Sequence, residues 1–218
     1  MFLDTANISE IKEISALGFF KGVTTNPTLL LKEKKNREVI INEIFEAYSK
    51  MLFVQAVGET HDEIYNDCKR ILQIDSTRIV LKIPATVEGM KVITSIKREN
   101  RYTPILATAV CSVEQGIISV LAGCDYIAPY VNRMESNNIN PYEVINKIRK
   151  YIDENKVDTK IVAASFKNPN QVNDAIFSGA HTVTIPYDIL NQMLNKQLVV
   201  ASVDKFNKDG YELEELGR

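Results

Sequence analysis

Short apolar runs alternate along the chain with longer amphipathic segments. The runs are rich in β-branched residues, which is typical of buried strands. In the segments between them, apolar residues recur at helical spacing, as at Ile64, Cys68 and Ile71, and give each predicted helix one face to bury. Strands that alternate with helices predict a parallel sheet with crossover helices. The predicted strands cover residues 2–4, 22–26, 52–57, 79–83, 105–110, 126–131, 161–165 and 182–185.

The ends of the predicted helices carry recognisable signals. Pro141 and Pro169 stand where a first helical residue is expected, and Gly18, Gly123 and Gly179 stand where helices should end. Five helices should begin with a capping side chain followed three residues later by a Glu or Gln that can cap in return. These pairs are Asn7 with Glu10, Thr60 with Glu63, Ser112 with Gln115, Asn140 with Glu143, and Asn168 with Gln171.

The number of strands and the length of the chain predict a single α/β domain, a (β/α)8 TIM barrel over residues 1–218. An additional helix is expected at about 199–209, and 32–38 is expected to be a solvated loop, with a mobile lid as the alternative. A doubly wound open sheet is the competing fold. Such a sheet usually has a glycine-rich phosphate turn after its first strand, whereas this chain has LDTAN there, and neither GxGxxG nor GxxxxGK[ST] occurs. The barrel is therefore preferred.

Composition narrows the class of partner. The formal charge is -2 and the basic residues are scattered, which disfavours nucleic acid and anionic membranes, and no apolar run is long enough to span a bilayer. The opening MFLDT leaves no room for a secretory leader, and three cysteines without CxxC spacing fit reduced thiols, so a cytoplasmic location is expected. His61 and His181 are isolated from other ligand types, so no metal site is predicted. The expected ligand is a small molecule.

Polar residues cluster where the predicted strands end. Side chains alternate between the two faces of a strand, and barrel active sites form at the carboxyl ends of the strands. In IVLKIP the residues Ile79, Leu81 and Ile83 form the outer face, so Val80 and Lys82 should point into the barrel. The same alternation places further polar side chains inside, namely Asp4, Thr24, Asn26, Gln55, Thr108, Tyr130 and Ser165.

Lys82 is the most informative of these residues. Burial in an apolar strand disfavours the ammonium form, and a neutral amine attacks carbonyl carbons, so a buried barrel lysine is a natural Schiff-base former. The structural alternative is an ion pair with Asp4, or a side chain that reaches the rim. Arg133, just beyond the sixth strand, and Ser165 are favoured as an anion site, with Lys167 a weaker candidate. Taken singly, the other polar residues have ordinary structural explanations, such as capping a turn or satisfying backbone groups.

Six motifs in order give a more specific indication. They are LDTAN at 3–7, GVTTNP at 22–27, VLKIPAT at 80–86, ATAV at 107–110, APYVNR at 128–133 and AASFKNP at 163–169. Over nearly the whole chain, this set resembles the small transaldolase and fructose-6-phosphate aldolase family.

The resemblance implies a role for each candidate residue and no metal or organic cofactor. Lys82 would form the Schiff base and Asp4 would assist proton transfer. Thr24 and Asn26 would contact the ketose, and Arg133 with Ser165 would hold the phosphate. A water held by Gln55, Thr108 and Tyr130 would carry protons to and from the reacting carbons. The resemblance also implies a homo-oligomer, a pentamer or decamer, with the C-terminal helix packed on a neighbour.

Two positions bear on the choice of reaction. Transaldolases that resemble this pattern typically have Glu at the place of Gln55 and Phe at the place of Tyr130, whereas the aldolases have the pair found here. The expected activity is therefore reversible cleavage of fructose 6-phosphate, or a similar ketose, into dihydroxyacetone and glyceraldehyde 3-phosphate. The first alternative is a transaldolase of the pentose phosphate pathway, which moves the dihydroxyacetone unit between sugar phosphates. A sugar-phosphate sensor without catalysis is the alternative from another class, and it would have no use for a neutral lysine.

Overall fold

Eight parallel strands close into a barrel in the computed structural model, which describes residues 1–216. Neighbours in sequence pair with each other, and the last strand pairs with the first. The strands are β1 (Phe2–Asp4), β2 (Gly22–Thr24), β3 (Met51–Gln55), β4 (Ile79–Pro84), β5 (Ile105–Val110), β6 (Tyr126–Pro129), β7 (Lys160–Ala163) and β8 (Thr182–Ile185).

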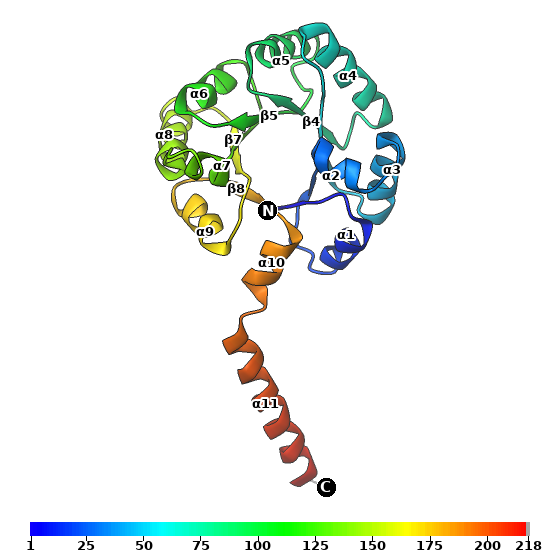
Figure 1. Cartoon of the computed structure of the whole chain (residues 1–218), viewed down its shortest axis with the longest axis vertical. Coiled ribbons are helices and arrows are strands. Elements are labelled where there is room, and N and C mark those ends of the chain that lie inside the picture. Colours follow the sequence, from blue (N-terminus) through cyan, green and yellow to red (C-terminus); the bar gives the residue numbers. More distant parts are fainter. Residues whose placement is uncertain (217–218) are drawn as a thin grey trace.

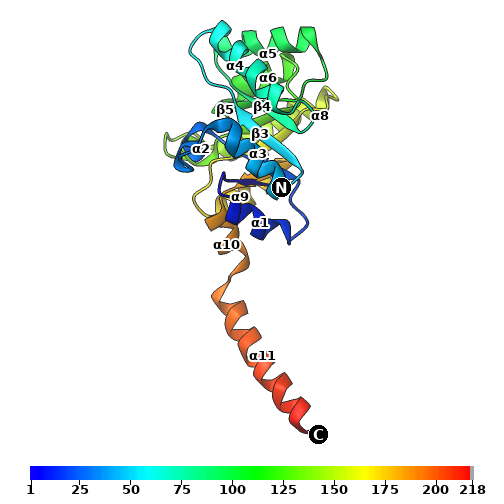
Figure 2. The same cartoon turned by 90° about the vertical axis from the view of Figure 1, so that its right-hand side faces the viewer.

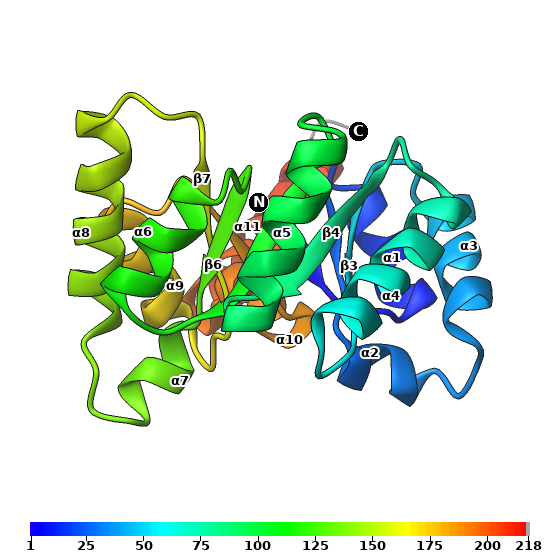
Figure 3. The same cartoon turned by 90° about the horizontal axis from the view of Figure 1, so that it is seen from above.

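Helices surround this barrel as a ring (Figure 1). The described helices are α1 (Ile8–Ser15), α2 (Pro27–Lys32), α3 (Arg37–Ala47), α4 (His61–Ile74), α5 (Val87–Glu99), α6 (Val113–Leu121), α7 (Val131–Glu135), α8 (Pro141–Glu154), α9 (Pro169–Phe177), α10 (Tyr187–Leu194) and α11 (Gln197–Leu216), and α11 lies outside the ring. The predicted single-domain TIM barrel with an additional C-terminal helix is confirmed. The short helices α2 and α7 lie at the same end of the barrel (Figure 3), and they follow the carboxyl ends of β2 and β6.

The predicted capping residues begin their helices. Thr60 and Glu63 form the complete reciprocal capping box. In α6 and α9 the reciprocal contact differs from the prediction, because Gln115 and Gln171 accept from the amides of Cys111 and Lys167, one residue before the cap. The glycines expected to end helices have positive φ, for instance 72° at Gly18, a conformation that costs glycine little.

Two apolar clusters divide the barrel into an outer and an inner core. The outer cluster contains Ile79, Leu81 and Ile83, which pack between the strands and the helices. The inner cluster contains Phe2, Phe53, Val80, Leu106, Ala128, Val162 and Ala164. The predicted alternation of faces in β4 is thus confirmed. Because the inner cluster contains the residue two positions before Lys82, the polar side chains lie above it, toward the carboxyl ends of the strands.

Several predicted strands end earlier than expected, and two segments outside the strands also differ from the prediction in their length. The loop expected over 32–38 is restricted to residues 33–36, because α2 continues to Lys32 and α3 begins at Arg37. Lys35 in this loop is ion-paired with Glu43 of α3 at 2.7 Å, which ties the loop to the helix. The C-terminal helix, expected over about 199–209, extends from Gln197 to Leu216. It projects away from the barrel, and none of its described residues is buried (Figures 1 and 2).

Candidate active site

A polar cavity of about 510 Å³ opens at the carboxyl ends of the strands. Its lining brings together all nine residues singled out in the sequence, from β1 round to the end of β7. They are Asp4, Thr24, Asn26, Gln55, Lys82, Thr108, Tyr130, Arg133 and Ser165. Lys167, the weaker anion candidate, lies outside this lining. The carboxyl end of the barrel is where the loops and strand ends of this fold assemble binding sites.

Lys82 lies in the interior of the site, on β4. Its side chain is only 6% exposed, and its Nζ donates a hydrogen bond to the backbone oxygen of Thr25 at 2.6 Å. Burial lowers the pKa of the Lys82 ammonium group below its ordinary value, and the charge of Asp4 partly opposes this effect. A larger fraction of neutral amine is therefore present than on a surface lysine, and the residue lines the cavity.

Asp4 lies at the end of β1 and accepts a hydrogen bond from the Thr24 hydroxyl at 2.7 Å on Oδ1. Burial raises the pKa of the Asp4 carboxyl group, against the opposing effects of the Lys82 charge and the Thr24 hydrogen bond. The hydrogen bond of the Lys82 amine goes to the Thr25 carbonyl, and its interaction with the Asp4 carboxylate is through charge. The arrangement leaves both groups facing the same space, as an amine and a carboxyl group that act on one ligand require.

A pair of hydroxyl groups lines the same cavity from the neighbouring strand β5 and from the residue after β6. The Thr108 and Tyr130 hydroxyl oxygens lie 2.8 Å apart. Burial raises the pKa of the Tyr130 phenol, which therefore stays protonated and can donate a hydrogen bond near neutral pH. Gln55 is the register partner of Lys82 across β3 and β4, so its amide flanks the amine. An amide and two hydroxyl groups supply both donors and acceptors for a water molecule.

Arg133 is exposed at the mouth of the cavity, on α7, and its guanidinium lies 5.6 Å from the centre of the Tyr130 ring. Ser165 follows β7 in a left-handed conformation with φ of 64°. Its carbonyl oxygen accepts a hydrogen bond from the amide of Asn132 at 2.7 Å, which ties the start of α7 to the end of β7. The connection places a cation and a hydroxyl group on one side of the cavity mouth, as a phosphate site requires.

Asn26 has the structural task that its sequence position already indicated, because its Oδ1 accepts from the amide of Leu29 and caps α2. Its side chain nevertheless lines the cavity. Sequence reasoning missed Thr184 on β8, although the alternation in TVTI would have placed it inward, since Val183 and Ile185 belong to the outer core. It also missed Ala109, whose φ of 59° accompanies a register shift in β5 that no local sequence signal announces.

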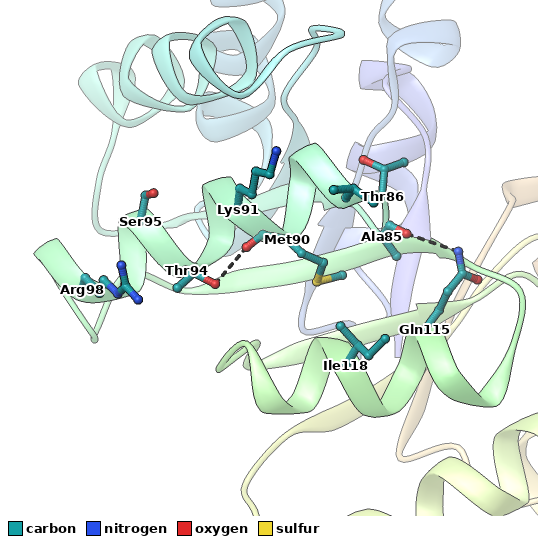
Figure 4. Close-up of a pocket in the computed structure, with 10 residues that line it drawn as sticks. Ala85, Thr86, Met90, Lys91, Thr94, Ser95, Arg98, Gln115 and Ile118 are labelled. Carbon is teal, nitrogen blue, oxygen red and sulfur yellow. Dashed lines mark hydrogen bonds between the residues drawn. The ribbon is translucent and has the colours of Figure 1, made fainter.

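A second, larger pocket of about 730 Å³ lies on the outer wall between α5 and α6 (Figure 4). Gln115 donates to the backbone oxygen of Ala85 at its edge, and Met90 and Ile118 lie along it. Its lysine, Lys91, is half-exposed and ion-paired with Glu88 at 2.6 Å. Because a solvated, paired ammonium group is a poor nucleophile, the polar cavity inside the barrel is the better candidate for an active site.

Both histidines already have structural partners. His61 contacts Asp62 and Ser95 and stacks on Tyr65, and His181 accepts a hydrogen bond from the amide of Ile161 through Nδ1. Within residues 1–216, no three His, Cys, Asp or Glu side chains form a group that could hold a metal ion. Over the same residues, no helix is both long enough and apolar enough to cross a membrane.

Comparison with known proteins shows the family of the chain. A sequence model of the family described as transaldolase/fructose-6-phosphate aldolase matches residues 1–217. A protein from Thermoanaerobacter sp. (strain X514), named "Probable transaldolase", is 32% identical over 208 residues, which cover 95% of this chain and 95% of the relative. The chain therefore belongs to the transaldolase/fructose-6-phosphate aldolase family, a family of enzymes that process sugar phosphates.

Proposed function

We propose that the protein is a Schiff-base aldolase that reversibly cleaves fructose 6-phosphate, or a similar ketose, into dihydroxyacetone and glyceraldehyde 3-phosphate. The observation that carries this proposal is the burial of Lys82 in a polar cavity beside Asp4. Burial of a lysine inside a barrel costs free energy. Its neutral amine is a nucleophile that attacks carbonyl carbons, and this reaction accounts for a lysine at this position.

The reaction begins at the ketose carbonyl. The Lys82 nitrogen adds to C2, and loss of water leaves a protonated imine. Asp4 accepts the proton of the C4 hydroxyl as the C3–C4 bond breaks, which releases glyceraldehyde 3-phosphate. The bonding electrons move to the cationic imine nitrogen, so the lysine-bound fragment becomes an enamine. These steps use only side chains of this chain and the substrate.

The enamine must then gain a proton at C3 before hydrolysis releases dihydroxyacetone. In this proposal a water held by Gln55, Thr108 and Tyr130 delivers that proton, and the 2.8 Å contact between the two hydroxyl oxygens supports the arrangement. Thr24 and Asn26 contact the ketose hydroxyl groups. Arg133 and Ser165 hold the phosphate at the mouth of the cavity, where a charged group need not be desolvated.

Transaldolase activity is the second candidate, and the name of the Thermoanaerobacter relative, "Probable transaldolase", favours it. In that reaction a second aldose phosphate captures the enamine before it is protonated. Gln55 and Tyr130 favour cleavage, because together they supply the amide and the phenol for the water. The test is incubation with fructose 6-phosphate alone. Release of free dihydroxyacetone supports the aldolase, turnover only after erythrose 4-phosphate is added supports the transaldolase, and binding without either reaction supports a sensor.

We also propose that the protein is cytoplasmic and forms a homo-oligomer, a pentamer or decamer, in which α11 packs on a neighbouring subunit. Three free cysteines support the location. In support of the assembly, α11 exposes Leu198, Phe206 and Leu213, each more than two-thirds exposed. An isolated helix is marginally stable in water, and burial of its apolar side against another copy would stabilise it.

A further inference from the structure

Three oxygen-bearing side chains from neighbouring strands form a chain of hydrogen bonds that ends at Asp4. The Thr24 hydroxyl oxygen on β2 lies 2.7 Å from Oδ1 of Asp4 and 2.6 Å from the hydroxyl oxygen of Thr184. Thr184 belongs to β8, on the other side of β1, and is only 5% exposed while it lines the cavity. The threonine hydroxyls therefore approach Asp4 from the strands on both sides of its own.

The number of hydroxyl protons fixes the direction of this chain. An ionised carboxylate can only accept, and the Thr24 hydroxyl has a single proton, which goes to Asp4. The contact between the two threonines then requires Thr184 to donate to Thr24. With a donor behind it, the Thr24 hydroxyl is polarised and is held in the rotamer that points at Asp4, because hydrogen bonds in a chain strengthen one another.

We propose that Thr184 is a positioning residue that directs the Thr24 hydroxyl at Asp4 and thereby stabilises the carboxylate form of Asp4. This inference rests on the proposed function, in which Asp4 must be ionised to accept the proton of the C4 hydroxyl. Thr184 itself does not touch the reacting atoms. Its effect passes through Thr24, and it opposes the effect of burial, which raises the pKa of Asp4.

Other groups also act on Asp4 and must be held constant in a test. Within the cavity, the titratable or charged groups that face it are Lys82 from β4, Tyr130 from the N-cap of α7 and Arg133 from α7. The adjacent strands β2 and β8 contribute the two threonine hydroxyls, which do not titrate. A change at position 184 therefore leaves every charged neighbour of Asp4 in place.

The test measures the titration of Asp4 directly. Infrared difference spectroscopy follows the protonated carboxyl band as a function of pH, and the band of Asp4 is assigned as the one that Asp4→Asn removes. Thr184→Val keeps the shape of the side chain and removes the donor, so the midpoint should rise by about half to one pH unit. Thr184→Ser should restore the wild-type midpoint, and Thr184→Cys, a weaker donor, should give a smaller rise.

A matched control separates this effect from the general cost of losing a buried hydroxyl. Thr159 is similarly buried, and its hydroxyl donates to the Cys124 oxygen at 2.8 Å, outside the cavity, so Thr159→Val should leave the Asp4 midpoint unchanged. An unchanged midpoint in Thr184→Val, or an equal rise in Thr159→Val, would overturn the inference. If the midpoint rises but the wild-type protein neither cleaves nor transfers ketose units, the effect of Thr184 on Asp4 through Thr24 stands and the proposed function is wrong.

Discussion

The Tyr130 hydroxyl is the group on which the proposed choice between cleavage and transfer depends. Tyr130→Phe removes this one oxygen and leaves the ring that lies under the Arg133 guanidinium. The hydroxyl contacts Thr108 and, in the proposed mechanism, helps to hold the water that protonates the enamine. Without that proton the enamine should persist until an aldehyde captures it. The substitution should therefore slow cleavage far more than transfer.

The size of the effect follows from what remains in the cavity. A positioned proton donor contributes about 10²- to 10⁴-fold to the rate. Gln55 and Thr108 would still contact the water, so we expect the lower end, about a hundredfold loss of dihydroxyacetone release. In Tyr130→Phe the Thr108 hydroxyl loses its partner, but it faces the cavity and can bind water in place of the phenol. The free energy of unfolding of this variant should therefore be only about 1 kcal/mol lower than that of wild type. Transfer does not use the water and should change little.

Both rates are measured on one preparation, first with fructose 6-phosphate alone and then with erythrose 4-phosphate added, so that losses from misfolding cancel in the ratio. Tyr126→Phe is the matched control, because Tyr126 begins β6, the strand that ends one residue before Tyr130, and lies outside the cavity lining. Its ratio of transfer to cleavage should equal that of wild type. Adding Gln55→Glu to Tyr130→Phe should move the balance further toward transfer. An unchanged ratio in Tyr130→Phe would refute the role of the water.

Three further predictions concern the phosphate, the cost of the buried lysine and the assembly. Arg133→Ala should lower the affinity for phosphorylated aldehydes by about tenfold and leave the affinity for unphosphorylated aldehydes unchanged. The expected loss is at the low end for a charge-assisted contact because Arg133 is exposed. An equal loss for both kinds of aldehyde would contradict the phosphate role. The pKa of Lys82 is lower in the folded than in the unfolded protein, so folding favours the neutral amine. The contribution of this group to the free energy of unfolding therefore rises with pH between the lowered pKa and the ordinary pKa of lysine. Lys82→Met should therefore raise the Tm, and by more at pH 6 than at pH 9; a gain that grows with pH would show that the ammonium form is favoured instead. Phe206→Asp with Leu213→Asp should dissociate the oligomer in native mass spectrometry without changing the circular dichroism of the barrel, and an unchanged mass would argue against a role for α11 in assembly.

Much of this arrangement follows from the two-residue period of a strand. One apolar face in IVLKIP was enough to place Lys82 inside the barrel, and the same period brought Asp4 and Thr108 to the cavity from other strands. Long-range contacts could not be predicted in this way. The carbonyl of Thr25 that receives the Lys82 hydrogen bond lies one residue beyond the end of β2, on a segment 57 residues away in the chain.

Backbone conformations with positive φ also could not be predicted from the sequence. Ser165 was expected to continue its strand, but its φ of 64° ends β7 two residues earlier. The predicted sixth strand is likewise shorter, because Val131 begins α7. These differences arise at the carboxyl ends of strands, where the chain turns to build the cavity and the regular alternation of side chains no longer applies.

Covalent trapping tests the central claim, that Lys82 forms an imine with a ketose. The wild-type protein is incubated with fructose 6-phosphate, reduced with borohydride and digested with trypsin. A reduced adduct on Lys82 blocks cleavage there, so the account predicts one modified peptide over residues 79–91, absent from Lys82→Arg and absent without substrate. An adduct on a different lysine, or no substrate-dependent adduct at all, would contradict the account.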